Sequence, residues 1–293
     1  MRLRNLVVAT DLSEAGSDAV KRAASIAAQC DAGLWVVHVI RWGALDVLHG
    51  LVSADHGRGL REQLARRADD TLVQLADELA GRHGIRVDTQ VAEGTVVRVI
   101  RDSAERRDAD LIVLGERGAG LVTELLLGTT SERLLGRAHR PMLVVRDAAT
   151  QAYQRVLVPV DFSDDSLRAL DLARIVAPAA EIVLMYAAEL PYEGLLDDAV
   201  VVGGMKGLRS AAEQAARDRL HGVGERCGLS SGGYSVEIAH GEAGQRILDV
   251  AEARDCDLIA IGRHGHNRLE EVITGSVTRH VLGFAAQDVL IAV

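Results

Sequence analysis

Residues 110–118 read DLIVLGERG, and nearly the same stretch returns as DLIAIGRHG at residues 257–265. Each copy is a short apolar run that ends in glycine, which is typical of a buried strand leaving a sheet. Gly262 follows Gly115 by 147 residues, and a later glycine, Gly275, follows Gly128 by the same 147 residues. We therefore predict that the chain contains two copies of one unit.

The glycines of each copy have a spacing that suits an anion. Two residues separate the first pair, and nine residues separate the second glycine from a third, which precedes Thr129 or Ser276. Glycine lets the backbone approach a phosphate closely, and a helix N-terminus adds N–H donors and partial positive charge. A single Gly-x-x-Gly is more often only a tight turn, but two copies of a three-glycine pattern after predicted strands indicate a phosphate-binding loop.

Both halves are predicted to alternate strands and helices. Strands are expected at residues 5–11, 34–40, 85–91, 111–114, 142–145, 156–161, 182–187, 234–238, 258–261 and 289–293. Helices are expected after the capping residues Ser13 and Ser163 and at residues 61–82, 96–106, 128–136, 211–226 and 244–253. The glycine-containing stretches 43–60 and 190–208 are predicted to be loops.

This pattern predicts an α/β fold of two tandem, open, parallel five-stranded sheets with helices on both faces, a Rossmann-like arrangement. We expect domains at residues 1–147 and 154–293, joined by a linker at residues 148–153 that lacks periodicity. In such sheets ligands bind beyond the carboxyl ends of the strands, near the switch in strand order.

Composition excludes several classes of function. The chain has 293 residues, 48% hydrophobic and 26% charged, with a net charge of −9, which argues against a broad nucleic-acid-binding surface. No apolar run is long enough for membrane insertion. Cys30, Cys227 and Cys256 form no Cys-x-x-Cys pair and are expected to be reduced thiols. Because residues 1–4 lead directly into a predicted strand, we expect a cytoplasmic protein.

At the glycine segments the chain resembles the universal stress protein family, in its tandem two-domain form. Nucleotide-binding members carry Gly-x-x-Gly, nine residues and then Gly-Ser/Thr, and both halves match this pattern. The resemblance implies that each half binds ATP, with Mg²⁺ or Mn²⁺ beside the phosphates.

The resemblance also assigns residues to each site. Asp11 and Asp161 match the acidic residue near the ribose and the metal, and Val39 and Ala187 match the position whose backbone meets adenine. The phosphate loops match at Gly115, Gly118, Gly128 and Thr129 in the first half and at Gly262, Gly265, Gly275 and Ser276 in the second. The candidate binding residues also include Thr10 and Val160, which precede the two aspartates, Arg117 and His264 within the loops, and Thr130 and Val277, which follow the hydroxyl residues.

Several of these residues have a structural alternative. Asp11 and Asp161 could simply cap their helices, and Ser131 and Thr278 could stabilise the helix start without touching ligand. Arg117 and His264 could face a phosphate or only water. A zinc pair of His264 with His266 is disfavoured because two histidines do not complete a zinc site.

The two loops also differ in charge. Arg263, His266 and Arg268 make the second loop more basic, whereas Glu116 and Glu124 add negative charge to the first. We therefore expect the second site to favour a polyphosphate more strongly.

The leading functional hypothesis is a stress-response protein whose ATP occupancy in both domains regulates conformation or binding of an unidentified regulatory protein. The resemblance implies that the domains pair about a pseudo-two-fold axis, with strands 142–145 and 289–293 as candidate contacts, and that the chain forms a homodimer. One alternative is a slow ATPase or nucleotidyl-transfer enzyme, although the chain has no Gly-x-x-x-x-Gly-Lys-Ser/Thr loop. Another is a structural dimerisation module with empty sites.

Overall fold

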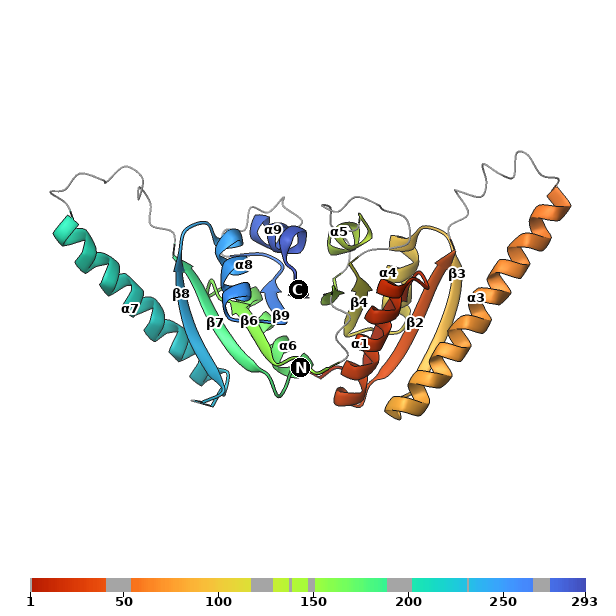
Figure 1. The fold of residues 1–293 in the computed structure, drawn as a ribbon, viewed down its shortest axis with the longest axis horizontal. Coiled ribbons are helices and arrows are strands. Elements are labelled where there is room, and N and C mark those ends of the chain that lie inside the picture. Colours follow the sequence, from red (N-terminus) through yellow and green to blue (C-terminus); the bar gives the residue numbers. More distant parts are fainter. Residues whose placement is uncertain are drawn as a thin grey trace. The chain divides into compact units, whose positions relative to one another are not determined.

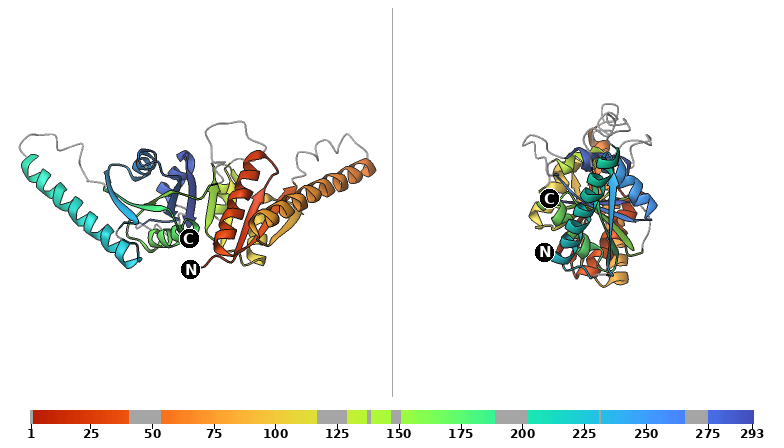
Figure 2. Two further views of the ribbon diagram at one scale, coloured as in Figure 1. Left: turned by 60° about the horizontal axis from the view of Figure 1, so that its bottom comes forward. Right: turned by 90° about the vertical axis from the view of Figure 1, so that its left-hand side faces the viewer.

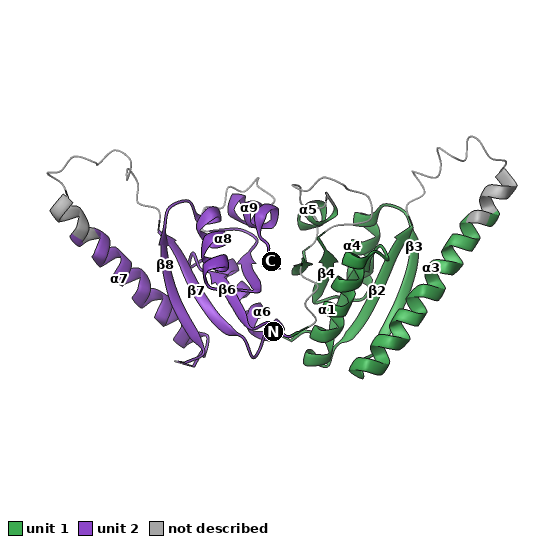
Figure 3. Cartoon of the chain, viewed as in Figure 1, with its two compact units in different colours: residues 1–151 green, residues 152–293 purple. Residues whose placement is uncertain are grey.

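The computed structural model describes residues 2–40, 54–116, 129–136, 139–146, 151–188, 202–230, 232–265 and 275–293. The chain divides into two compact units, Met1–Gln151 and Ala152–Val293 (Figure 3). Each unit is built on a parallel sheet flanked by helices (Figures 1 and 2).

The first unit has a sheet of order β3-β2-β1-β4-β5 in which the described neighbours pair in parallel. Helices α1 and α4 both pack on β1, the strand beside the switch in order. The elements are β1 (Asn5–Thr10), α1 (Glu14–Cys30), β2 (Gly33–Ile40), α3 (Ala54–His83), β3 (Val87–Glu93), α4 (Val96–Arg106), β4 (Leu111–Gly115), α5 (Thr129–Leu135) and β5 (Met142–Val145).

The second unit repeats this order as β8-β7-β6-β9-β10, again with parallel pairs. Its elements are β6 (Arg155–Pro159), α6 (Asp164–Val176), β7 (Glu181–Ala188), α7 (Val202–Arg226), β8 (Tyr234–His240), α8 (Ala243–Ala253), β9 (Leu258–Gly262), α9 (Ser276–Phe284) and β10 (Asp288–Ala292). The predicted parallel α/β class, with five strands in each half, is confirmed.

The central strands form because their residues are apolar on both faces. The first four residues of β4 and all five of β9 are buried, as expected for parallel strands covered by helices on both sides. Ser13 and Ser163 cap α1 and α6 as predicted, because their hydroxyls accept the N–H groups of Gly16 and Ser166 at 3.2 and 3.3 Å.

Two helices begin earlier than the sequence predicts. Helix α3 starts at Ala54 and α7 at Val202, so residues 54–60 and 202–208 are helical although they were expected to be loop. Both starts contain several glycines, each of which lowers helix propensity by about 1 kcal/mol. An established helix nevertheless gains one hydrogen bond for each added residue. The remaining parts of the two predicted loops, 43–53 and 190–201, lie outside the described residues.

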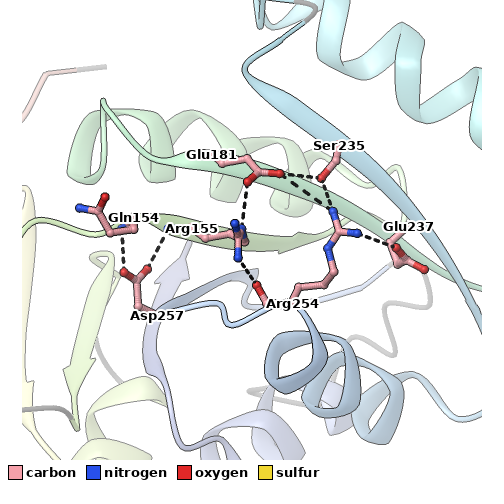
Figure 4. Close-up of polar contacts among 7 residues, drawn as sticks. All are labelled: Gln154, Arg155, Glu181, Ser235, Glu237, Arg254 and Asp257. Carbon is pink, nitrogen blue, oxygen red and sulfur yellow. Dashed lines mark hydrogen bonds and ion pairs between the residues drawn. The ribbon is translucent and has the colours of Figure 1, made fainter.

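The aspartate that opens each repeated segment anchors the amino edge of its sheet. Asp257 accepts the backbone N–H groups of Gln154 and Arg155 at 2.7 and 3.2 Å (Figure 4). Asp110 accepts those of Arg4 and Asn5 at 2.7 and 3.0 Å in the same way. Each aspartate therefore ties the chain before β9 or β4 to the start of β6 or β1.

In the second unit this edge carries a wider polar network (Figure 4). Arg155 bonds Glu181 at 2.9 Å, and Arg254 bonds Ser235 at 2.8 Å. The hydrogen bond from Arg155 holds the pKa of Glu181 below its ordinary value. Because these groups lie at the amino ends of the strands and satisfy one another, the network has a structural role, away from the glycine segments.

A buried hydrogen bond joins the chain before β6 to the last strand of the second unit. Asp288 is 0% exposed, and the Tyr153 hydroxyl, itself buried, donates to its Oδ2 at 2.6 Å. Removing a donor from a buried carboxylate costs more than losing an exposed hydrogen bond, since the carboxylate cannot turn to water. Tyr153 is thus an anchor of this unit.

We expect Tyr153→Phe to lower the free energy of unfolding by about 1–3 kcal/mol, measured by urea denaturation. Tyr234→Phe is the matched control, because its hydroxyl lies 3.0 Å from His221 Nδ1 in an exposed position. The control should change stability by less than about 0.5 kcal/mol. Equal effects of the two changes would contradict the role of the buried pair.

The three cysteines are free thiols. Burial raises the pKa of the Cys256 thiol to about 11, so this thiol is protonated at neutral pH and is a poor nucleophile. Among the helices in the described part of the chain, none is long and apolar enough to cross a membrane.

Candidate functional site

The predicted site residues that the structure describes lie at the carboxyl edge of each sheet. In the second unit, β9 pairs with β6, and Gly262 ends β9 just as Val160 and Asp161 follow β6. In the first unit, β4 pairs with β1, so that Gly115 and Thr10 end neighbouring strands. The strand order switches at these pairs, which is where open α/β sheets bind ligands.

In the second unit the three glycines of the pattern are brought together. The Gly275 N–H donates to the Arg263 carbonyl at 3.1 Å. A Cβ atom added to Gly275 would lie 3.4 Å from that same oxygen and 3.8 Å from the Cα of His264. Gly275, which precedes α9, therefore lies beside the residues that follow Gly262 at the end of β9.

Thr278 closes this arrangement from inside α9. Its buried hydroxyl donates to the Gly262 carbonyl at 2.8 Å. Thr278 thus stabilises the helix start, in agreement with the structural alternative. Ser276, the first residue of α9, is exposed, and Val277 is half-buried.

Gly265 lies directly against Asp161. A Cβ atom on Gly265 would be 2.9 Å from Asp161 Oδ2. The other carboxylate oxygen, Oδ1, accepts the Ser163 N–H at 3.0 Å and the Ser163 hydroxyl at 2.6 Å. Asp161 therefore supports the start of α6 and also borders the glycine segment. This placement is compatible with both interpretations, a helix-capping residue and a ligand-binding residue.

Asp165 is a residue of this site that the sequence interpretation missed. It lies in the first turn of α6 and is 3% exposed. Its Oδ2 accepts the His264 backbone N–H at 3.2 Å and lies 3.3 Å from His264 Nδ1, while Arg168 pairs with Oδ1. A Cβ atom on Gly262 would be only 2.7 Å from the Asp165 carbonyl carbon, so glycine is required where β9 meets α6.

The charges beside the strand ends are different from those expected. Arg263 is only 6% exposed, and burial lowers the pKa of its guanidinium while nearby Asp165 opposes that shift. Glu116, its counterpart in the first unit, pairs with Arg146 at 2.8 Å. Neither residue adds a simple surface charge to its loop. The other residues of the predicted charge contrast, Glu124, His266 and Arg268, lie outside the described residues.

The remaining positions of the second unit have local contacts of their own. Val160 is buried, and its N–H donates to the Met185 carbonyl at 2.7 Å. Ala187 is half-buried near the end of β7, opposite Ala239 of β8. It therefore lies near the carboxyl edge of the sheet.

In the first unit the described residues match this geometry where comparison is possible. Asp11 Oδ1 accepts the Ser13 N–H at 3.0 Å, as Asp161 does for Ser163. The Thr10 hydroxyl accepts the Leu12 N–H at 3.0 Å, and Val39 is half-buried near the end of β2. Thr129 and Thr130 open α5. The predicted residues Arg117, Gly118 and Gly128 lie outside the described part of the chain.

The described residues contain no group of three or more histidine, cysteine, aspartate or glutamate side chains placed to hold a metal. Asp11 and Asp161 each offer one carboxylate at the carboxyl edge of a sheet. Mg²⁺ is commonly held by one or two carboxylates together with phosphate oxygens and water. These residues therefore fit a cation that accompanies a nucleotide.

Comparison with known proteins gives one family for both halves. The model of the universal stress protein family matches residues 2–146 and 152–292. A universal stress protein from Mycolicibacterium smegmatis is 26% identical over 98% of this chain and 96% of its own length. One from Methanocaldococcus jannaschii is 30% identical over 49% of this chain and 82% of its own. The crystal structure of a universal stress protein from Archaeoglobus fulgidus covers 100% of this chain and 99% of that one, with a TM-score of 0.68 and 19% identity.

Proposed function

Since this chain belongs to the universal stress protein family, we propose that it binds ATP in both units and that nucleotide occupancy regulates its conformation or its binding of a partner protein. The observation that carries the proposal is that Gly262 and Gly275 lie together where β9 ends and α9 begins, while the intervening Gly265 borders Asp161. The first unit has the same glycine pattern in its sequence, and its Asp11 is placed as Asp161 is in the second unit.

The chemistry of these residues supports a polyphosphate ligand. Glycines leave the backbone open to close approach, and the start of α9 adds N–H donors with partial positive charge. Asp161 borders this segment and would face the ribose and a divalent cation, while Ala187 would lie on the adenine side. When bound, Mg²⁺ or Mn²⁺ would neutralise part of the phosphate charge.

The chain lacks the P-loop motif Gly-x-x-x-x-Gly-Lys-Ser/Thr. The lysine of that motif contacts the β- and γ-phosphates in many nucleotide-hydrolysing enzymes. Regulated binding therefore remains our proposal, with slow ATP hydrolysis and an empty dimerisation module as the alternatives. We further propose that the protein acts as a cytoplasmic homodimer in a stress response.

We expect calorimetric titration with MgATP to give a stoichiometry of two nucleotides per chain, because each half carries the complete glycine pattern. Mass spectrometry of gently purified protein should identify adenine nucleotide. Absence of both signals would favour the dimerisation module. Multiple-turnover release of ADP, lost on combined Asp11→Asn and Asp161→Asn substitution, would instead favour an enzyme.

A further inference from the structure

We propose that Asp165 is a positioning residue that orients His264 so that nucleotide binding by the second unit, but not by the first, takes up a proton. This inference rests on the proposed function and concerns the same site. It starts from a buried carboxylate that contacts one residue of the glycine segment twice, through the backbone N–H at 3.2 Å and through the ring Nδ1 at 3.3 Å.

The contact with Asp165 determines what His264 can offer to a ligand. A carboxylate only accepts hydrogen bonds, so the tautomer that suits this contact carries its proton on Nδ1. The neutral ring then has only a lone pair at Nε2, and a phosphate oxygen, which is also an acceptor, cannot bond there. A second proton converts Nε2 into a donor. The side chain of His264 is 30% exposed, so the ring is not enclosed by the protein.

The charges of the groups near His264 do not oppose a second proton on its ring. Asp165 faces it from α6 and pairs with Arg168, Arg263 precedes it in sequence, and Asp161 lies against the following Gly265. Within the described part of the chain, these two carboxylates and two guanidiniums carry equal and opposite charge. Protonated His264 adds one positive charge to this set, which favours a polyphosphate.

The first unit lacks both members of this pair. Asp11 and Ser13 correspond to Asp161 and Ser163, so Ala15 stands at the position of Asp165. Arg117 stands at the position of His264. Arginine is permanently charged, whereas imidazole changes its charge between about pH 5 and 8. The two sites therefore differ in how their affinity depends on pH.

The test is calorimetric titration of the full chain with MgATP at pH 7.5 in buffers of different ionisation enthalpy, which counts the protons taken up. We expect the wild type to take up as much as one proton more per chain than His264→Gln. Replacing His264 by arginine, as in the first unit, should restore affinity without proton uptake. Lowering the pH from 8 to 6 should strengthen the second site by no more than tenfold per pH unit, relative to His264→Arg. Protonation of the nucleotide itself is common to both proteins.

Asp165→Asn tests the positioning role, because it removes the charge but keeps a similar shape. We expect it to reduce proton uptake toward the value of His264→Gln. Asp164→Asn is the matched control, since Asp164 is an exposed acid in the same helical turn, and it should leave uptake unchanged. If Asp165→Asn does not fold, the comparison of His264→Gln with His264→Arg still decides the proposal.

Two outcomes would overturn the inference and can be told apart. Equal proton counts for wild type and His264→Gln, with two nucleotides still bound by the wild type, would contradict this inference alone. No binding of ATP by the wild type would contradict both this inference and the proposed function.

Discussion

Replacing Gly262 by alanine is expected to destabilise the second unit by about 1–3 kcal/mol. The added Cβ would lie 2.7 Å from the carbonyl carbon of Asp165 and 3.0 Å from its oxygen. These are backbone atoms in the first turn of α6, whose start is held by Ser163. A side chain could rotate away, but here the helix and β9 must separate. The loss should appear in urea denaturation, and hydrogen exchange should become faster in α6.

Gly283→Ala is the matched control for this prediction. Gly283 lies in α9 of the same unit, and a Cβ atom there would meet nothing within 4 Å. Because alanine has the higher helix propensity, the control should be neutral or stabilising by up to about 1 kcal/mol. A similar loss of stability in both variants would show that the contact between Gly262 and Asp165 is not the cause.

The repeated segment made most of the fold predictable. An apolar run ending in glycine can be recognised without tertiary information, because parallel strands are buried on both faces. Helix α4 was predicted at residues 96–106 and occupies Val96–Arg106, since its apolar positions recur at helical spacing. The early start of α3 was missed, because local propensity disfavours the glycines that a long helix accommodates.

The candidate site was less predictable, because burial and pairing depend on tertiary contacts. An acid in the first turn of a helix usually interacts with the helix dipole at the surface, so nothing in the sequence showed that Asp165 is buried against His264. The sequence marks position 165 only as a difference between the halves, since Ala15 stands at the corresponding place in the first half. Arg263 was counted as loop charge for the same reason, although it is buried beside Asp165.

The second large effect is expected from Gly265→Val, which should weaken MgATP binding to the second unit by at least about 100-fold, or about 2.7 kcal/mol. The new Cβ would meet Asp161 Oδ2 at 2.9 Å and would place a branched side chain where the backbone must approach the ligand. Calorimetric stoichiometry should fall from two nucleotides per chain to one. Gly118→Val is the matched change in the first half, and the double variant should bind none.

Stability should respond differently to these two glycine substitutions, although Gly262 and Gly265 are three residues apart. The Cβ at position 262 would strike backbone, whereas the one at position 265 would strike the end of a side chain. Asp161 can move at the cost of its hydrogen bonds to Ser163, so Gly265→Val should lose binding while the second unit loses less stability in urea than with Gly262→Ala. Unchanged stoichiometry in both single variants, Gly118→Val and Gly265→Val, would contradict the assignment of the sites. If Gly265→Val unfolded the unit as readily as Gly262→Ala, Gly265 would be needed for packing, and the close approach of the backbone to a phosphate would not explain it.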